Sequence, residues 1–233
     1  MNLKIYTNIK VYLLYLISLK NRKFINFLMK NMKFSKSQVY QDLFIIYFSK
    51  LKKNGKFIEI GGGNGVDLSN TYLHEKKYKW KGVICEPDNR SHANIKKYRN
   101  AKLEKQAISD ICKKNTSFYQ SQDPYLSSLH ATSHLYKKII TDALCLNHLI
   151  TKFKLGTEID YISIDTEGNE LEIIQKFNFK KYTVNFFTIE HNFNNPKRYQ
   201  IYKIMKKNGF KRVFKFLSYM DDWYIGKQIY ADK

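Results

Sequence analysis

The chain has 233 residues, enough for one α/β domain with a large core and too few for two comfortable domains. Its hydrophobic fraction of 43% argues against a disordered chain, and 41 Lys and Arg against 20 Asp and Glu give a net charge of +21. This charge favours an anionic partner: nucleic acid, a membrane surface or an acidic glycan. Because the lysines are spread along the chain, genome composition is the alternative explanation.

Residues 1–36 form a basic and apolar segment ahead of the rest of the chain. The apolar run at 11–18 is about half the length needed to cross a bilayer, so it predicts no transmembrane helix. Lysines and apolar residues up to position 32 predict cationic amphipathic helices, which lie either on an anionic membrane or on the domain itself. Basic residues follow the apolar run where a signal peptide would have small ones.

The three cysteines, Cys85, Cys112 and Cys145, are odd in number and show no metal-ligand spacing. They predict a reduced protein with a cytoplasmic location. The N-terminal segment adds an alternative within the same compartment, a peripheral position at the inner face of a membrane.

The first regular elements form a strand, glycine turn, helix and strand, at residues 57–60, 61–65, 67–78 and 82–86. In such a unit the turn and the helix N-terminus face a ligand. Glu86, at the tip of the second strand, is placed to hold a pair of ribose hydroxyls. The unit therefore predicts a nucleoside ligand.

The spacing of the glycines indicates which nucleoside. A dinucleotide fingerprint requires a third glycine at the position of Val66, so that fingerprint is incomplete. The pattern present is E-x-G-x-G-x-G, made by Glu59, Gly61, Gly63 and Gly65. It is similar to the first motif of class I S-adenosylmethionine methyltransferases, whose ligand has a cationic amino acid tail where a dinucleotide has pyrophosphate.

The remaining elements alternate between helix and strand and end in two strands. We expect a helix at 88–98, strands at 101–108 and 116–120, a loop over the site at 121–137, a helix at 142–153, a strand at 160–165, a helix from Gly168, a strand at 184–190, a basic helix at 197–207, and strands at 210–216 and 220–225. This order predicts a mostly parallel sheet with helices on both faces and an antiparallel strand near one edge.

Two further strand tips bear carboxylates, Asp165 and Glu190. Ligands of open α/β sheets bind at the carboxyl ends of the strands, so we expect both acids to line one cleft with Glu86. For the nearby Glu167, Glu170 and Glu172, a helix cap or a solvated helix face is the preferred interpretation.

Six segments together resemble the FkbM family of methyltransferases: SQVYQDLF (37–44), KFIEIGGGNG (56–65), GVICEPD (82–88), KQAISD (105–110), IDYISIDTEGNELEII (159–174) and FFTIEHN (186–192). The resemblance runs from about residue 37 to 225. It implies a Rossmann-like class I fold with a seven-stranded sheet, a methyltransferase domain at 37–233, and O-methylation of a sugar hydroxyl in glycan or surface polysaccharide biosynthesis.

The same resemblance implies a binding site for S-adenosyl-L-methionine. Its implied residues are Glu59, Gly61, Gly63 and Gly65 at the methionine part, Glu86 at the ribose, Ser109 and Asp110 at the adenine edge, Asp165 at a neighbouring strand tip, and Gln38, Gln41 and Asp42 closing the pocket. One departure concerns the stretch ALCLNHL, where Asn147 and His148 stand in place of acids that are common in the family.

For catalysis, we expect His191 to act as the base, Glu190 to orient it and Asp165 to assist. The alternative is that His191 only packs or caps; His130 and His134 in the loop are further candidates. Metal dependence is open, because Asp165, Glu190, His191 and Asn192 can either present ligands to a divalent ion or bind sugar hydroxyls directly.

Two other classes of function remain. A nucleic-acid methyltransferase would explain the charge, but the chain has no Asp/Asn-Pro-Pro-aromatic motif and no cysteine placed to attack a pyrimidine. A non-catalytic module that binds cofactor or membrane is the second alternative. The sequence therefore favours a sugar or glycan acceptor over nucleic acid.

Overall fold

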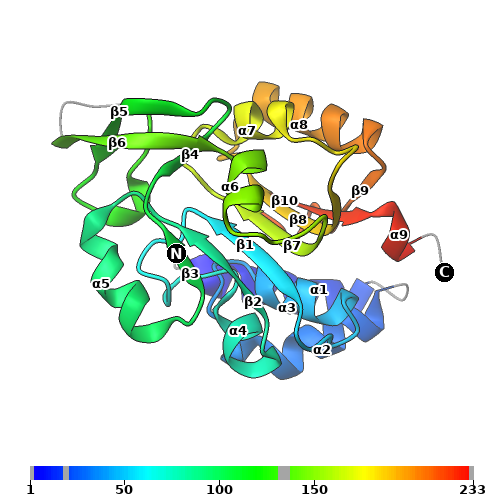
Figure 1. The fold of residues 1–233 in the computed structure, drawn as a ribbon. Coiled ribbons are helices and arrows are strands. Elements are labelled where there is room, and N and C mark those ends of the chain that lie inside the picture. Colours follow the sequence, from blue (N-terminus) through cyan, green and yellow to red (C-terminus); the bar gives the residue numbers. More distant parts are fainter. Residues whose placement is uncertain (1–2, 18–20, 131–136, 231–233) are drawn as a thin grey trace.

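A computed structural model describes residues 3–17, 21–130 and 137–230, and its centre is a seven-stranded sheet (Figure 1). The strand order is β3-β2-β1-β7-β8-β10-β9. The bounds are β1 (Lys56–Ile60), β2 (Lys81–Cys85), β3 (Lys102–Glu104), β7 (Glu158–Ile164), β8 (Thr183–Glu190), β9 (Phe210–Val213) and β10 (Asp221–Gly226). Only β10 runs antiparallel to its neighbours, which confirms the predicted fold class.

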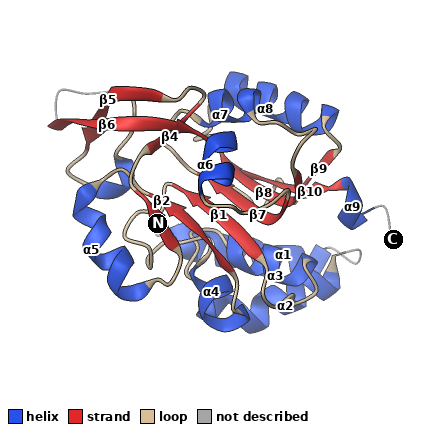
Figure 2. Cartoon of the chain, viewed as in Figure 1, coloured by secondary structure: helices blue, strands red, loops and turns tan. Residues whose placement is uncertain are grey.

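Helices cover both faces of this sheet (Figure 2). One face carries α1 (Leu3–Ile17), α2 (Arg22–Asn31), α3 (Gln41–Phe48), α4 (Tyr72–Tyr78) and α5 (Asn89–Tyr98); the other carries α6 (Leu146–Lys152), α7 (Glu170–Lys176) and α8 (Asn195–Lys207); α9 (Lys227–Tyr230) follows β10. Successive strand residues point to opposite faces, so Phe57 and Tyr161 enter one core, and Ile58 and Ile162 the other. Burial on both faces explains the nearly continuous apolar runs in the sequence.

A second, three-stranded sheet lies beside the first, in the order β4-β6-β5. Its strands are β4 (Ala107–Ser109), β5 (Lys113–Gln120) and β6 (Lys137–Cys145). The predicted strand 101–108 is wrong in extent, because it divides into β3 and β4 in different sheets. The predicted helix 142–153 begins only at Leu146, since residues up to Cys145 pair with strands on both edges and this pairing overrides helical periodicity.

Two other boundaries also differ from prediction. Helix α4 begins at Tyr72 and not at Asp67, because Ser69, Asn70 and Thr71 hydrogen-bond to a buried carboxylate instead of continuing a helix. Strand β9 ends at Val213, and Phe214 adopts a left-handed backbone conformation that leaves the sheet.

The N-terminal segment forms two helices, α1 and α2, followed by a short 3₁₀ turn at Met32–Phe34. Helix α2 buries Phe24, Ile25 and Leu28 in the core formed with α3, so this part of the segment packs on the domain. No helix within the described residues has the length and apolar character to cross a bilayer.

The cysteines differ from the sequence-based expectation. Cys112 and Cys145 are joined by a disulfide, with Cα atoms 5.3 Å apart, whereas Cys85 is free and buried. The prediction of a fully reduced chain is therefore wrong for this structure. The two residues are 33 positions apart and meet because β4 and β5 both pair with the end of β6, a contact that spacing alone does not reveal.

Candidate active site

A cavity of about 290 Å³ opens where β1, β2, β7 and β8 end. The registers pair Ile60 with Cys85 and with Ile164, so these strands end level and the residues that follow meet at one edge. Six carboxylate side chains line the cavity: Asp67, Glu86, Asp123, Asp165, Glu167 and Glu190. No Lys, Arg or His stands among its lining residues in the described part of the chain.

The glycine turn after β1 forms the floor of the cavity. Gly61 has φ +81°, and a Cβ built there would lie 1.6 Å from the carbonyl oxygen of Asp165. At Gly63, φ is +49° and a Cβ would meet the ring of Tyr125 at 2.5 Å. Both positions therefore require glycine, one because two strand tips touch and one because a loop closes over the turn.

Glu86 faces the cavity from the tip of β2, as predicted from its position. Its carboxylate accepts hydrogen bonds from the backbone N–H groups of Gly63 and Asp88, each at 2.8 Å. Burial raises the pKa of Glu86 to about 8, although these two hydrogen bonds oppose the shift. The turn and the acid are thus held as one unit, with lone pairs remaining for ligand hydroxyls.

Asp165, Glu167 and Glu190 form an acid cluster in the opposite wall, and one oxygen of each lies within 4.8 Å of the others. Asn192 donates hydrogen bonds to Glu167 at 2.9 Å and to Glu190 at 3.0 Å. Burial and mutual repulsion raise the pKa of Asp165 to about 7 and that of Glu167 to about 7, and they also raise the pKa of Glu190. Such a cluster can share and accept protons near neutral pH, and its oxygens are within reach of a divalent ion.

The start of α3 and the segment before it place two predicted residues at the cavity. Gln38 and Gln41 line it, and the Gln41 amide donates a hydrogen bond of 2.6 Å to Asp221 on β10. Asp42 lies behind the cavity wall, where its carboxylate accepts hydrogen bonds from Ser35 and from the backbone of Lys36. Gln41 is therefore positioned for ligand contact, whereas Asp42 holds the turn that presents it.

Glu59 does not reach the cavity, contrary to the expectation that it meets a cationic tail. Its carboxylate accepts hydrogen bonds from the Ser69 hydroxyl, from the Asn70 backbone N–H at 2.6 Å and from the Thr71 hydroxyl at 2.6 Å. The buried guanidinium of Arg99 lies 3.4 Å away and completes its surroundings. Glu59 thus anchors the segment between the turn and α4.

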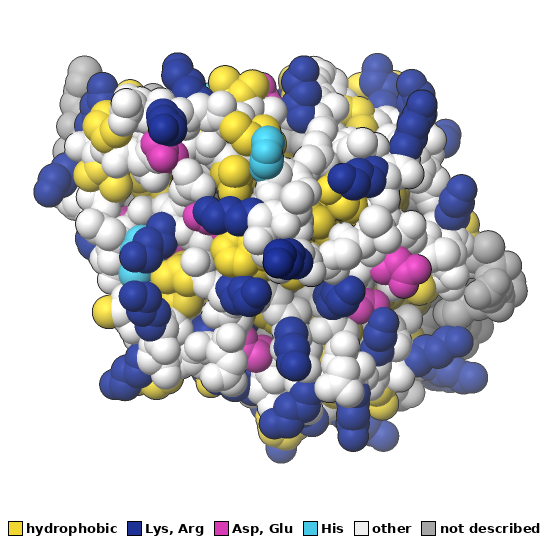
Figure 3. Space-filling model, viewed as in Figure 1, with side chains coloured by type: hydrophobic (Ala, Val, Ile, Leu, Met, Phe, Trp, Pro, Cys, Tyr) yellow, Lys and Arg dark blue, Asp and Glu magenta, His cyan; other side chains and the backbone are white. Residues whose placement is uncertain are grey.

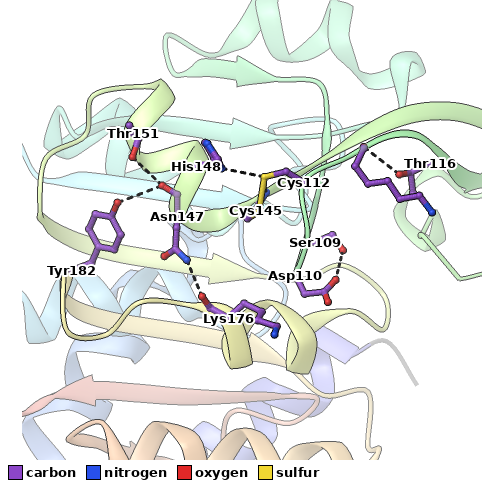
Figure 4. The surroundings of a disulfide bond; sticks show 11 residues. Ser109, Asp110, Cys112, Thr116, Cys145, Asn147, His148, Thr151, Lys176 and Tyr182 are labelled. Carbon is purple, nitrogen blue, oxygen red and sulfur yellow. Dashed lines mark hydrogen bonds between the residues drawn. A yellow bond between two sulfur atoms is a disulfide. The ribbon is translucent and has the colours of Figure 1, made fainter.

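Three other predicted cofactor residues also lie outside the cavity wall. Gly65 packs near Ile95 of α5. Ser109, a buried residue at the end of β4, donates a hydrogen bond of 2.9 Å to its neighbour Asp110 (Figure 4). The cavity is lined by the preceding pair, Ala107 and Ile108, which offer an apolar surface suited to a flat ring.

His191 is buried and points away from the cavity, so Glu190 does not orient it. Its Nδ1 accepts the backbone N–H of Phe193 at 3.0 Å, and its Nε2 lies 4.0 Å from Asp222. Burial, followed by the charge of Arg198, lowers the pKa of His191 to about 4. This geometry fits the packing alternative. His130 is exposed near Gly168, and His134 lies outside the described residues.

Sequence reasoning missed several cavity residues, above all Glu167, which it assigned to a cap or a solvated face. Glu167 has φ +56° and Gly168 has φ +126°, so the chain turns sharply after β7 and directs the carboxylate into the cavity. Glu170 is the residue that caps this turn, accepting the backbone N–H groups of Thr166 and Gly168. In the sequence, Gly168 directly after Glu167 was the feature that could have indicated this sharp turn.

The sheet order, with β10 alone antiparallel, defines the class I S-adenosylmethionine-dependent methyltransferase fold. A family model described as the methyltransferase FkbM domain matches residues 59–212, which is more than half of the chain. The chain belongs to this family, and it is accordingly a methyltransferase whose cofactor is S-adenosylmethionine.

Several solved structures are similar to this chain. A precorrin-6y C5,15-methyltransferase from Geobacter metallireducens GS-15 has a TM-score of 0.42 at 10% identity, covering 79% of this chain and 86% of that one. A methyltransferase from Pyrococcus furiosus gives 0.41 at 14%, covering 80% and 82%. A SAM-dependent methyltransferase from Aquifex aeolicus gives 0.40 at 11%, covering 84% and 96%. No curated protein matches the chain.

Proposed function

We propose that this methyltransferase acts on a hydroxyl group of a sugar, in the biosynthesis of a glycan or surface polysaccharide. The observation that carries this proposal is the acid lining of the cavity, which has no basic side chain among its described residues. Carboxylates accept hydrogen bonds from neutral hydroxyls, whereas they repel phosphate groups. The site therefore favours a polyhydroxylated acceptor over a nucleic acid.

The cofactor half of the proposed site is the glycine turn with Glu86. The turn lacks side chains where a ligand must approach backbone, and Glu86 offers acceptors for a ribose hydroxyl pair. Ala107 and Ile108 supply an apolar wall, and Gln38 and Gln41 lie at its edge. The excess of acids suits a ligand with a sulfonium and an ammonium group, so the residues present fit S-adenosylmethionine.

The catalytic half is the acid cluster, with Asp165 as the proposed proton acceptor and Glu190, whose pKa is raised by burial and by its acidic neighbours, as its protonated partner. When bound, S-adenosylmethionine supplies an electrophilic methyl group on a positively charged sulfur. Asp165 takes the proton of the acceptor hydroxyl, because its pKa of about 7 leaves it deprotonated in part of the molecules near neutral pH. Glu190 and Asn192 hold the acceptor and the proton in the cluster. This assignment replaces His191 as the base and requires no metal ion.

We further propose that residues 37–233 carry the methyltransferase domain and that α1, in residues 1–36, contacts an anionic membrane. Among the α1 side chains that the structure describes, four apolar ones are exposed: Ile5 (54%), Ile9 (47%), Tyr12 (53%) and Leu13 (48%). Their spacing places them along one helix face. Exposed Lys23 and Lys30 on the neighbouring α2 complement an anionic lipid surface. In the cytoplasm, this contact would bring the enzyme to the inner face of a membrane.

The test of the proposed function is methyl transfer from labelled S-adenosylmethionine to two sets of acceptors, neutral oligosaccharides and RNA. We expect label in the oligosaccharides, as an ether stable to base, and none in RNA above background. Transfer to RNA alone would overturn the sugar assignment. Transfer to neither, in protein that binds the cofactor, would also contradict it if the set includes the glycans made by the source cell.

A further inference from the structure

Two cysteines and a histidine converge at the edge of the small sheet, away from the residues of the acid-lined cavity (Figure 4). Cys112 lies between β4 and β5, Cys145 is the last residue of β6, and His148 is in the first turn of α6. The Nδ1 atom of His148 lies 3.2 Å from the sulfur of Cys112. Cys112 and His148 are exposed and Cys145 is half-buried, so solutes can reach this Cys–His cluster.

The distances within the Cys–His cluster match those of a metal site. One ligand atom from each residue lies within 4.8 Å of the other two. A tetrahedral Zn²⁺ with Zn–S bonds of about 2.3 Å and Zn–N bonds of about 2.0 Å keeps its ligand atoms roughly 3.3–3.8 Å apart. A small rotation of the cysteine side chains reaches that spacing once the disulfide is open. Two thiolates with an imidazole select Zn²⁺ over Mg²⁺ or Ca²⁺.

The histidine is held in place by the fold. Its neighbour Asn147 donates a hydrogen bond of 2.8 Å to the carbonyl of Lys176 (Figure 4). Asn147 also accepts a hydrogen bond of 3.0 Å from the backbone N–H of Asn178. These contacts fix the start of α6 against the end of α7. Cys145 is the N-cap of α6 and His148 follows in its first turn, and their ligand atoms lie within 4.8 Å of each other. Two of the three ligands are thus positioned before any ion binds.

We propose that the reduced Cys–His cluster is a Zn²⁺ site with Cys112, Cys145 and His148 as ligands and water in the fourth position. A dithiol reductant gives two electrons and two protons to the disulfide, producing two cysteine thiols and an oxidised dithiol. Zn²⁺ then binds both sulfurs as thiolates and releases two protons. The disulfide and the zinc complex use the same sulfur atoms, so they exclude each other.

The location of the Cys–His cluster links it to the cavity. Zinc bound there would join the turn after β4, the end of β6 and the start of α6. Strand β5 continues into the stretch that covers the cavity, with Phe118, Tyr125 and Leu129 among its lining residues. In either form, disulfide or zinc complex, the cluster fastens the base of the β5–β6 hairpin.

Titration of the phosphine-reduced full chain with Co²⁺, as a spectroscopic substitute for Zn²⁺, tests the proposal. We expect thiolate-to-cobalt charge-transfer absorption and tetrahedral ligand-field bands that saturate at one ion per chain, and their loss when one equivalent of Zn²⁺ is added. Cys112→Ser and Cys145→Ser should abolish the charge-transfer band. His148→Ala should weaken Zn²⁺ binding at least about tenfold, because even indirect partners of a metal have effects of that size.

Controls separate a metal site from scattered thiols and from misfolding. The double variant Cys112→Ser/Cys145→Ser retains Cys85 and should show no band, and His130→Ala, which removes an exposed imidazole elsewhere, should bind like wild type. His148→Cys replaces the imidazole ligand by a thiolate, which Zn²⁺ also binds, and should keep tight binding. Circular dichroism checks folding of each variant. Absence of the charge-transfer band in the reduced wild type, or an unchanged band in Cys112→Ser, would overturn the proposal.

Discussion

The surface and the cavity of this protein have opposite electrostatic character. Lys and Arg side chains are scattered over the face shown in Figure 3, in keeping with a net charge of +21. The cavity, by contrast, is lined by six carboxylates and by no basic side chain of the described residues. Composition alone favoured an anionic partner, yet the side chains that line the cavity favour a cationic or neutral ligand. Net charge therefore describes the solvent-facing surface and not the lining of the cavity.

This contrast has an energetic side as well. Buried carboxylates that gain too few hydrogen bonds are costly in their ionised form, and their pKa values rise. Burial raises the pKa of Glu86 to about 8 and that of Asp221, behind the cavity, to about 7. The predictions below use this difference between cavity and surface, beginning with the largest expected effect.

The ligand-free protein should be more stable at about pH 5 than at about pH 8. The folded state keeps protons on Glu86 and Asp221 that the unfolded state releases from about pH 4 upward, so the free energy of unfolding falls as pH rises from about 4 to about 8. We expect a decrease of several kcal/mol, measured by urea unfolding, because each unit of pKa shift corresponds to about 1.4 kcal/mol. Glu86→Gln should remove much of this slope, and Glu158→Gln, on the exposed surface, should leave it unchanged. A flat profile in the wild type would show that the cavity acids are ionised without penalty.

Asp165→Asn should lower turnover about 100-fold or more, the scale of a lost proton acceptor. Wild-type turnover should rise as pH increases through about 7, because Asp165 must be deprotonated to act, and chelators should have no effect. Glu172→Gln, a half-buried carboxylate on α7 that does not line the cavity, is the matched control. Initial rates of label transfer provide the measurement. Full activity in Asp165→Asn would remove it from the mechanism, and loss on chelation would instead support a metal ion at the acid cluster.

Glu86→Ala should weaken binding of S-adenosylmethionine by about 1–3 kcal/mol, the contribution of two hydrogen bonds to the ribose hydroxyls. Isothermal calorimetry measures this directly, with NAD as the negative control because its pyrophosphate meets an acidic cavity. Glu59→Gln is the informative comparison. Since Glu59 contacts protein groups only, we expect it to reduce stability and to leave affinity in the folded fraction nearly unchanged. Unaltered affinity in Glu86→Ala would contradict the ribose assignment.

The membrane contact is expected to show the smallest effect. Ile9→Asp should reduce the fraction of protein that sediments with anionic vesicles about fivefold, since removing one apolar side chain from the interface loses ~1 kcal/mol or more. Rising ionic strength should release the wild type, because lysines contribute to binding. Ile140→Asp, at an isoleucine on β6 that is also exposed, is the control. Equal loss in both variants would indicate nonspecific adhesion and not a surface on α1.

The main sheet could be predicted because its signals are local. Short apolar runs with β-branched residues, such as 57–60 and 160–164, predict buried strands. Their alternation with helices predicts a parallel sheet. Strand β6 could not be predicted, because its pairing with two partners distant in sequence outweighs the helical pattern of residues 142–153. The disulfide depends on the same distant pairing.

For the site, the position of a residue just after a strand predicted that it lies near the cavity. The sequence did not show whether its side chain points into the cavity. Glu86, Asp165 and Glu190 reach the cavity because level strand ends bring them together. Glu59 was expected there too, yet it lies inside β1 and points to the opposite side, toward Arg99. His191 follows Glu190 directly, and successive residues of an extended chain face opposite ways. Because Glu190 points into the cavity, its neighbour His191 points away from it.

The contact between Gly61 and the Asp165 carbonyl has a consequence for how this enzyme can diversify. The same backbone contact supports the cofactor turn on one side and the proposed proton acceptor on the other, so a change at either strand tip alters both functions together. The stretch with Tyr125 and Leu129 covers the cavity from outside the main sheet; Tyr125 touches the turn at Gly63, but the stretch takes no part in the Gly61–Asp165 contact. We expect natural variants with new acceptors to differ in that stretch while keeping the strand tips unchanged.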